Sequence, residues 1–133
     1  TLGYHLKIDT GMNRLGFRHD NLRRTLPELL ASENLRLDAV YTHFASADVP
    51  ESPVFEMQRV NYEKALRVMD DLLPRPAAID HSLGGGETVR AASRFLRHAA
   101  NSAAILRDSR VWYDVVRPGL LLYGIVPPPL AST

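Results

Sequence analysis

The sequence predicts an α/β fold with a parallel β-sheet, and two observations support this prediction. Segments typical of strands alternate with segments typical of helices along the 133 residues, which is the pattern of β-α-β units. Polar side chains suited to binding also recur just after the predicted strands, where parallel α/β proteins build their sites. The length is that of one domain.

The first strand is predicted over residues 4–9, where apolar and polar side chains alternate with a period of two. Asp20 is then expected to cap a helix whose leucines recur at helical spacing, and Pro27 to divide that helix into two short pieces. The sequence DAVYT, residues 38–42, predicts a second strand. Together these segments form the first strand–helix–strand unit.

A long helix is predicted next, with Ser52 as its N-cap, Pro53 in its first position and an end near Leu73. Six apolar side chains of this helix are expected to form its buried stripe: Val54, Met57, Val60, Ala65, Met69 and Leu72. The segments that follow are expected in this order: a short strand at 77–79, a glycine-rich break at 84–86, a helix at 87–94, a strand at 95–100, a short helix from Ala103 and a strand at 111–116.

Composition excludes several classes of protein. Hydrophobic residues make up 45% of the chain and charged residues 23%, as in globular domains rather than disordered chains. A net charge of +1 gives no signal of a nucleic-acid surface, and no apolar run approaches the ~18 residues of a membrane span. The chain has no cysteine, so disulfides, thiol nucleophiles and thiolate metal ligands are excluded. Without a signal peptide, it is expected to be cytoplasmic.

Four polar residues fall at or just after the carboxyl ends of predicted strands: Arg14, His43, Ser102 and Arg117. Each arginine could fork a carboxylate or a ring nitrogen, although surface ion pairs are the commoner role. Asn101 and Ser102 stand at a predicted helix start, where a hydroxyl, a carboxamide and free N–H groups suit a phosphate; a plain N-cap is the simpler interpretation. Gly119 would allow close approach of the backbone to the same phosphate, or would simply form a turn.

Lysine and histidine leave other interpretations open. Lys7 is one of two lysines, and it suits either a Schiff base or a charge pair with Asp9, whereas Lys64 suits the surface. The triple glycine at residues 84–86 lacks the spacing of known phosphate loops and is interpreted as a flexible connection. No metal is expected, because the spacing of the candidate histidines matches no known metal-ligand motif. These histidines are His5, His43, His81 and His98.

Four segments of the chain resemble, in the right order, the alanine racemase family: HLKIDTGMNRLGF at residues 5–17, YTHFASAD at 41–48, HAANSAA at 98–104 and VRPGLLLYGI at 116–125. The resemblance extends over nearly the whole chain. It implies a pyridoxal 5'-phosphate enzyme with an N-terminal (β/α)8 barrel, a C-terminal β domain and a homodimeric assembly. The chain's own share is then a partial TIM barrel of about four β/α units with parallel strands.

The resemblance also implies a role for each candidate residue. Arg14 would contact the substrate carboxylate and the phenolic oxygen of the cofactor, and Lys7 would be a carbamylated lysine supporting Arg14 rather than the Schiff-base lysine. The cofactor would be held by His43 against the pyridine ring, Arg117 at the pyridine nitrogen, and Asn101, Ser102, Gly119 and Leu120 around the phosphate. A guanidinium stays protonated, so Arg117 can donate to that nitrogen but cannot readily protonate it, which favours racemisation over transamination.

Several parts of the family pattern are absent. A complete barrel needs ~250 residues, so the chain is expected to be the C-terminal half of the barrel domain, at residues 1–126, followed at 127–133 by the start of the linker to the β domain. The lysine that carries the cofactor and the tyrosine that acts as a base are both missing. Residues 77–97 also form a longer segment than the family pattern has there. The chain alone is therefore expected to be inactive.

The expected function of the parent protein is the interconversion of L-alanine and D-alanine by two opposed bases, which supplies D-alanine for peptidoglycan. Two alternatives remain open: a racemase for another small amino acid, and a non-catalytic barrel protein that binds pyridoxal phosphate. The sequence shows no apolar or charged surface pattern that would indicate a pure interaction module. An open half-barrel would leave strand edges unpaired, which predicts poor solubility or self-association.

Overall fold

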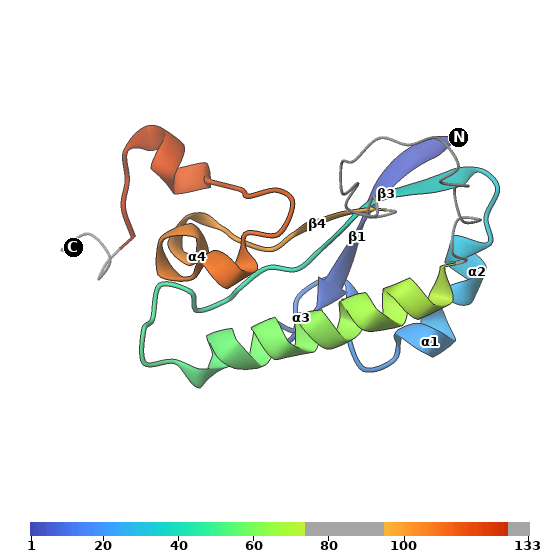
Figure 1. The fold of residues 1–133 in the computed structure, drawn as a ribbon, viewed down its shortest axis with the longest axis horizontal. Helices are drawn as coiled ribbons and strands as arrows, with labels where there is room; N and C mark the ends of the chain where they lie inside the picture. Colours follow the sequence, from blue (N-terminus) through green and yellow to red (C-terminus); the bar gives the residue numbers. More distant parts are fainter. Residues whose placement is uncertain (74–94, 128–133) are drawn as a thin grey trace, which may run out of the picture.

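A sheet of four parallel strands organises the computed structural model of the chain, which describes residues 1–73 and 95–127 (Figure 1). The strand order is β2-β1-β3-β4, and each neighbouring pair is parallel. The strands are β1 (Leu2–Asp9), β2 (Phe17–Arg18), β3 (Leu35–Tyr41) and β4 (Leu96–His98). The predicted α/β class with parallel strands is confirmed.

The strands differ from the prediction mainly at their ends. β1 and β3 begin earlier than predicted because they pair from Leu2 and Leu35 onward, and a register shift between Tyr4 and His5 interrupts their ladder. β4 is shorter than the predicted strand at residues 95–100. The prediction lacks β2, since a strand of two residues offers no alternation to detect.

The predicted strand at residues 111–116 is wrong. The chain there leaves a short 3-10 helix, η1 (Ser109–Val111), and then makes an isolated parallel bridge between Val115 and His98. Tyr113 adopts a positive φ of 49°, which lies far from the extended region that a strand requires. This turn of the backbone replaces the expected strand.

The described helices are α1 (Leu22–Thr25), α2 (Pro27–Leu30), α3 (Pro53–Leu72) and α4 (Ser102–Arg107), followed by a 3-10 helix, η2 (Gly119–Tyr123). The division at Pro27 is confirmed, because α1 ends just before this residue and α2 begins on it. The predicted Asp20 cap is wrong. Asn21 holds the N-cap position, and Asp20 forms an ion pair with Arg18 at 2.8 Å instead.

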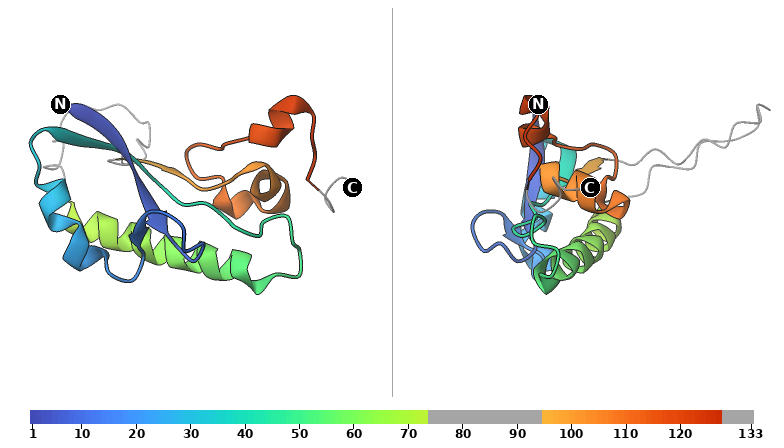
Figure 2. Two further views of the ribbon diagram at one scale, coloured as in Figure 1. Left: turned by 180° about the vertical axis from the view of Figure 1, so that it is seen from behind. Right: turned by 90° about the vertical axis from the view of Figure 1, so that its left-hand side faces the viewer.

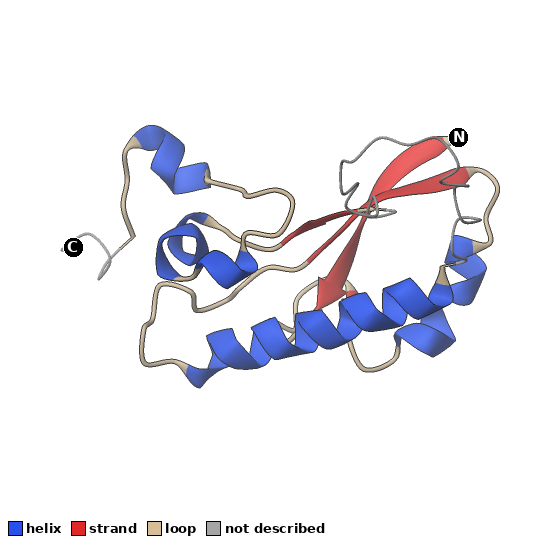
Figure 3. Cartoon of the chain, viewed as in Figure 1, coloured by secondary structure: helices blue, strands red, loops and turns tan. Residues whose placement is uncertain are grey.

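α3 runs along one side of the sheet, as Figures 1 and 3 show, and it is capped by the Ser52 hydroxyl as predicted. Its buried side chains are Phe55, Gln58, Tyr62, Ala65, Leu66 and Met69. The predicted stripe is therefore only partly correct: Ala65 and Met69 are buried and Leu72 packs against the core, but Met57 is 47% exposed. The prediction assigned apolar side chains alone to the core, whereas the face toward the sheet also buries the polar Gln58.

The core lies between the sheet and α3. Ile8 of β1 and Val40 of β3 are fully buried there, and the Tyr62 hydroxyl donates to the Val40 carbonyl at 2.7 Å. α4 and η2 lie beyond the carboxyl ends of the strands, at the opposite end of the molecule from the N-terminus (Figure 2). The segments predicted at 77–79, 84–86 and 87–94 fall outside the described residues. None of the described helices is long and apolar enough to cross a membrane.

Candidate functional site

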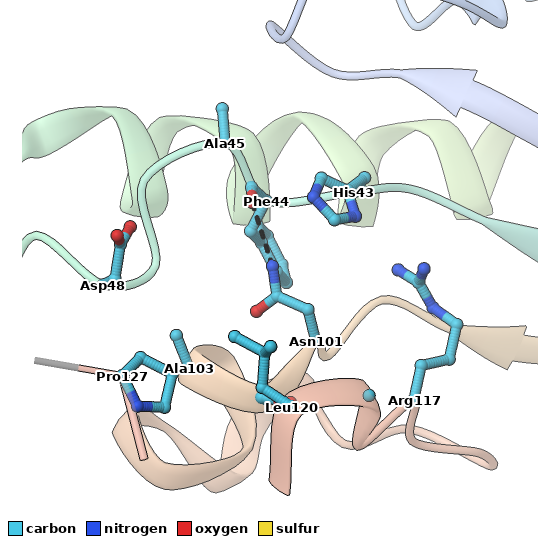
Figure 4. A pocket seen from close by; sticks show the side chains of 11 residues that line it. His43, Phe44, Ala45, Asp48, Asn101, Ala103, Arg117, Leu120 and Pro127 are labelled. Atoms are coloured by element: carbon cyan, nitrogen blue, oxygen red, sulfur yellow. Dashed lines mark hydrogen bonds between the residues drawn. The ribbon is translucent and has the colours of Figure 1, made fainter. Parts of the chain in front are cut away.

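A cleft of about 530 Å³ lies where the loops after β3 and β4 meet the segment that leads into η2 (Figure 4). Its lining residues belong to loops and to the first turns of α4 and η2, not to strands. Six of the lining residues are those that the sequence assigned to cofactor binding: His43, Asn101, Ser102, Arg117, Gly119 and Leu120. The fold therefore brings together side chains that lie up to 77 positions apart in sequence, counting from 43 to 120.

Arg117 connects the ends of β3 and β4. Its Nη2 donates to the carbonyl of Thr42 at 2.8 Å and to that of Ala99 at 3.0 Å, and its backbone N–H donates to Ala100 at 2.9 Å. Burial lowers the pKa of the Arg117 guanidinium, yet a guanidinium remains protonated in a protein. The Nε atom is buried and has no hydrogen-bond partner among the described residues, so one donor remains free.

His43 lies half-buried beside three cations. Burial is the largest cause that lowers the pKa of its ring, and the charges of Arg117, Arg14 and Lys7 lower this pKa further. Within residues 1–73 and 95–127, none of the three cations forms an ion pair with a carboxylate. The positive charges near His43 would attract an anionic ligand.

Arg14 and Lys7 do not line the cleft itself. Arg14 is exposed in the loop after β1, and Lys7 is half-buried in β1, in register with Tyr41 of β3. Asp9 orders this loop: its Oδ1 accepts the N–H groups of Gly11 at 3.1 Å and Asn13 at 3.0 Å. The charge pair with Asp9, one of the interpretations open for Lys7, is absent from the ion pairs of the described residues. Against the opposing effect of burial, the backbone N–H groups of the loop, and then the charge of Lys7, lower the pKa of the Asp9 carboxyl.

Asn101 is the N-cap of α4, which was the simpler of its two interpretations. Its Oδ1 accepts from the N–H of Ala104 at 3.0 Å, and its Nδ2 donates to the carbonyl of Phe44 at 3.1 Å, the dashed line in Figure 4. Ser102 is buried, and its Oγ accepts from the N–H of Leu121 at 3.2 Å. Asn101 thus joins α4 to the loop after β3, while the Ser102 hydroxyl keeps its own proton available for donation.

Gly119 and Leu120 begin η2, so their N–H groups have no partner within that turn. A Cβ atom placed on Gly119 would meet no heavy atom within 4 Å. Packing within the described chain therefore does not require glycine at this position. What glycine provides is an open backbone at the edge of the cleft.

Arg107 of α4 fixes the loop between β3 and α3. Its guanidinium donates to four carbonyl oxygens: Ser46 at 3.2 Å, Ala47 at 3.3 Å, Val49 at 3.0 Å and Pro50 at 2.9 Å. Its Cζ also lies 4.2 Å from the ring centroid of Phe55. This loop carries Asp48, the acidic side chain on the wall of the cleft. Sequence reasoning missed Arg107, because an arginine in a short helix is usually exposed.

His98 is buried in a group of rings on the face of the sheet opposite α3. The Tyr41 ring stacks on it at 4.8 Å, and the His5 ring meets it edge-on at 5.4 Å. Neither ring nitrogen has a hydrogen-bond partner among the described residues. Burial, then the charge of Arg117, then His5 lower the pKa of His98 to about 4. Residues 1–73 and 95–127 contain no cluster of three or more metal-ligand side chains.

His98 makes stability depend on pH in a predictable direction. Its pKa is about 4 in the folded chain and 6.5 ordinarily. Between these two pH values the unfolded chain binds a proton at His98 and the folded chain does not, so lowering the pH favours the unfolded chain. This contribution to stability is complete above pH 6.5 and is lost toward pH 4. We expect the difference in unfolding free energy between wild type and His98→Phe to shrink between about pH 7.5 and about pH 4.5. A difference that stays constant in denaturant titrations would contradict this expectation.

The fold and the cleft together define a class of protein: an α/β chain whose parallel strands end at a cleft lined by polar side chains, at the carboxyl edge of its sheet. Residues 1–127 match the model of the alanine racemase N-terminal domain family. The chain belongs to this family. The predicted partial TIM barrel is thereby confirmed.

Individual relatives agree with this assignment. The alanine racemase of Carboxydothermus hydrogenoformans is 41% identical over 127 residues, which cover 96% of this chain and 29% of that protein. The crystal structure of alanine racemase from Bacillus anthracis with bound L-Ala-P superposes with a TM-score of 0.76 and 30% identity, covering 99% of this chain and 30% of that one. The biosynthetic alanine racemase of Pseudomonas aeruginosa superposes with a TM-score of 0.66 at 32% identity, covering 95% of this chain and 28% of that one. The chain thus spans less than a third of the length of these relatives.

Proposed function

We propose that the protein carrying this chain is a pyridoxal 5'-phosphate-dependent alanine racemase, which interconverts L-alanine and D-alanine and supplies D-alanine for peptidoglycan. The observation that carries the proposal is the cleft, since all six residues assigned to the cofactor line it. The names of the relatives at 34% and 41% identity support the choice of reaction and of alanine as substrate.

The residues of the cleft fit this cofactor. Its phosphate would be held by the Ser102 hydroxyl and by the N–H groups of Gly119 and Leu120, where the backbone is open. Asn101 would hold the start of α4 in place through its two hydrogen bonds. When bound, the cofactor supplies an electron-accepting ring that stabilises negative charge at the α-carbon of an amino acid. Arg117 would donate to the ring nitrogen; its buried Nε, which lacks a partner among the described residues, shows donor capacity not used by the fold.

His43, Arg14 and Lys7 would act around the substrate. His43 would lie against the cofactor ring, kept neutral at pH 7 by burial and by the positive charges of Arg117 and Arg14. Arg14 would hold the substrate carboxylate and the phenolic oxygen. Carbamylation of Lys7 would replace its positive charge by a negative one, and so give Arg14 an anionic partner. This proposal accounts for the absence of a carboxylate paired with Arg14 in the described chain.

The chain's place in the whole protein is part of the same proposal. Residues 1–126 would form the C-terminal half of the barrel domain and residues 127–133 the start of a linker to a β domain. The lysine that carries the cofactor and the tyrosine base would come from other segments of a cytoplasmic homodimer. The residues of this chain would then bind and orient, whereas proton removal and return at the two faces of the substrate would fall to those bases.

Racemisation of L-alanine by the full-length protein tests the proposal, with optical rotation as the readout and pyridoxal phosphate added or removed. We expect activity with the cofactor and none without it, and no activity from the 133-residue chain alone. Faster turnover of another small amino acid would correct the substrate. Tight cofactor binding with no turnover of any amino acid would contradict the enzymatic proposal and favour a binding protein.

A further inference from the structure

Gln58 is a polar side chain in the second turn of α3, on the face that packs on the sheet, and it is fully buried. All of its hydrogen-bonding groups are engaged. Its Nε2 donates to the carbonyl of His43 at 3.0 Å and to Thr10 Oγ1 at 3.2 Å. Its Oε1 accepts from the N–H of Ala45 at 2.9 Å. One amide thus holds the loop after β1 and the loop after β3 together.

The network extends from Gln58 to the other elements of the site. Thr10 and Thr42, both buried, share a hydrogen bond of 2.7 Å between their hydroxyls. The carbonyl of Thr42 accepts from Arg117 at 2.8 Å. Asn61, one turn after Gln58 on α3, donates to the carbonyl of Thr10 at 3.0 Å. The side-chain amides of α3 therefore hold the loop that bears Arg14 and the backbone of His43. Through Thr10 they also connect to Thr42, whose carbonyl accepts from Arg117.

An apolar side chain would satisfy the packing of this helix face at lower cost. A buried amide loses its hydration and returns little net stability even when every hydrogen bond is made. Such fully connected polar groups do, however, fix the relative position of the elements that they join. Position matters at this site, because His43 and Arg117 line the same cleft and Arg117 donates to the carbonyl of Thr42, the residue just before His43, at 2.8 Å.

We propose that Gln58 is a positioning residue of the site: it holds His43 and the loop after β1 in fixed register, so that His43 keeps its place beside Arg117 and Arg14. The consequence for turnover rests on the proposed racemase function. The effect on the position of His43 does not rest on that function, because it follows from the hydrogen bonds of Gln58 alone.

Gln58→Met in the full-length protein tests this inference, because methionine fills a similar volume with no charge and no amide. We expect the ring pKa of His43, followed by NMR, to rise by about half a unit or more as the ring moves away from the cations and toward solvent. The kcat/KM for alanine should fall by about tenfold or more. Lys64→Gln, on the exposed side of the same helix, serves as the matched control and should match wild type in both measurements.

Thr10→Val keeps the inference testable should Gln58→Met fail to fold, since it removes the two hydrogen bonds of Thr10 Oγ1, with Gln58 Nε2 and with Thr42 Oγ1, and leaves the helix intact. It should move the His43 pKa in the same direction by a smaller amount. A lower melting temperature with an unchanged His43 pKa and unchanged kcat/KM would overturn the inference and leave Gln58 a purely structural residue. If the wild-type protein has no racemase activity but the variants still raise the pKa of His43, the positioning role is supported and the proposed function is contradicted.

Discussion

Arg117→Leu is expected to weaken both the fold and the activity of the full-length protein. Leucine can replace none of the hydrogen bonds to the carbonyls of Thr42 and Ala99, which end neighbouring strands. Leaving two buried acceptors without donors costs about 1–3 kcal/mol each, reduced where water can enter the cleft. The free energy of unfolding, measured by denaturant titration, should fall accordingly. The kcat/KM for alanine should fall by about a hundredfold or more, as ~2.7 kcal/mol of lost interaction implies.

Arg117→Lys separates the two effects. An ammonium retains the positive charge, but it lacks the planar guanidinium in which Nη2 donates to both carbonyls while the buried Nε has no partner among the described residues. We expect stability between those of wild type and Arg117→Leu, and activity much closer to that of the leucine variant. Equal affinity of wild type and Arg117→Leu for pyridoxal phosphate would contradict a role of Arg117 in the cofactor site.

Gly119→Val is expected to spare the fold and to damage the cofactor site. No atom of the described chain lies within 4 Å of the position that a Cβ would take, so the free energy of unfolding should change by less than about 0.5 kcal/mol. The added side chain would stand over the open backbone proposed to meet the phosphate. The dissociation constant for pyridoxal phosphate, measured by fluorescence titration, should rise by about tenfold or more.

Gly124→Ala is the matched control for this experiment, and the opposite result is expected. Gly124 has a φ of +72°, a left-handed conformation that alanine adopts with strain of about 1 kcal/mol, and it also has open space around it. It ends η2 away from the cleft lining. Stability should fall with little change in cofactor affinity. An unchanged affinity of Gly119→Val for pyridoxal phosphate would contradict the assignment of Gly119 to the cofactor site.

The parts of the fold that the sequence predicted correctly are those set by local chemistry. The alternation of side chains in β1, the break at Pro27 and the Ser52 cap each depend on residues within one turn or strand. The error at residues 111–116 has a non-local cause. Asp114 lies within this segment and places its carboxylate on the N–H of Arg97 in β4 at 2.9 Å. A side chain thus takes a group at the strand edge that the backbone of a fifth strand would have used, and backbone pairing is limited to the bridge between Val115 and His98.

The site was predictable to a similar extent. Polar residues directly after strands, such as His43 and Arg117, could be selected because parallel strands bring their carboxyl ends to one edge. Their individual roles came from the family resemblance and remain proposals. Gln58 and Arg107 escaped detection because each contributes through backbone groups far away in sequence. A glutamine among the apolar positions of α3 was the one local signal of the network, and only the packed helix shows what it contacts.

The four carbonyls bound by Arg107 have a consequence for the thermodynamics of ligand binding. Residues 46–50 lie outside any helix or strand, and fixing such a backbone costs about 1–2 kcal/mol of conformational entropy per residue. Because Arg107 fixes them through contacts within the chain, this cost belongs to folding rather than to binding. A ligand entering the cleft then meets a wall that is already ordered, and more of its interaction energy remains as affinity.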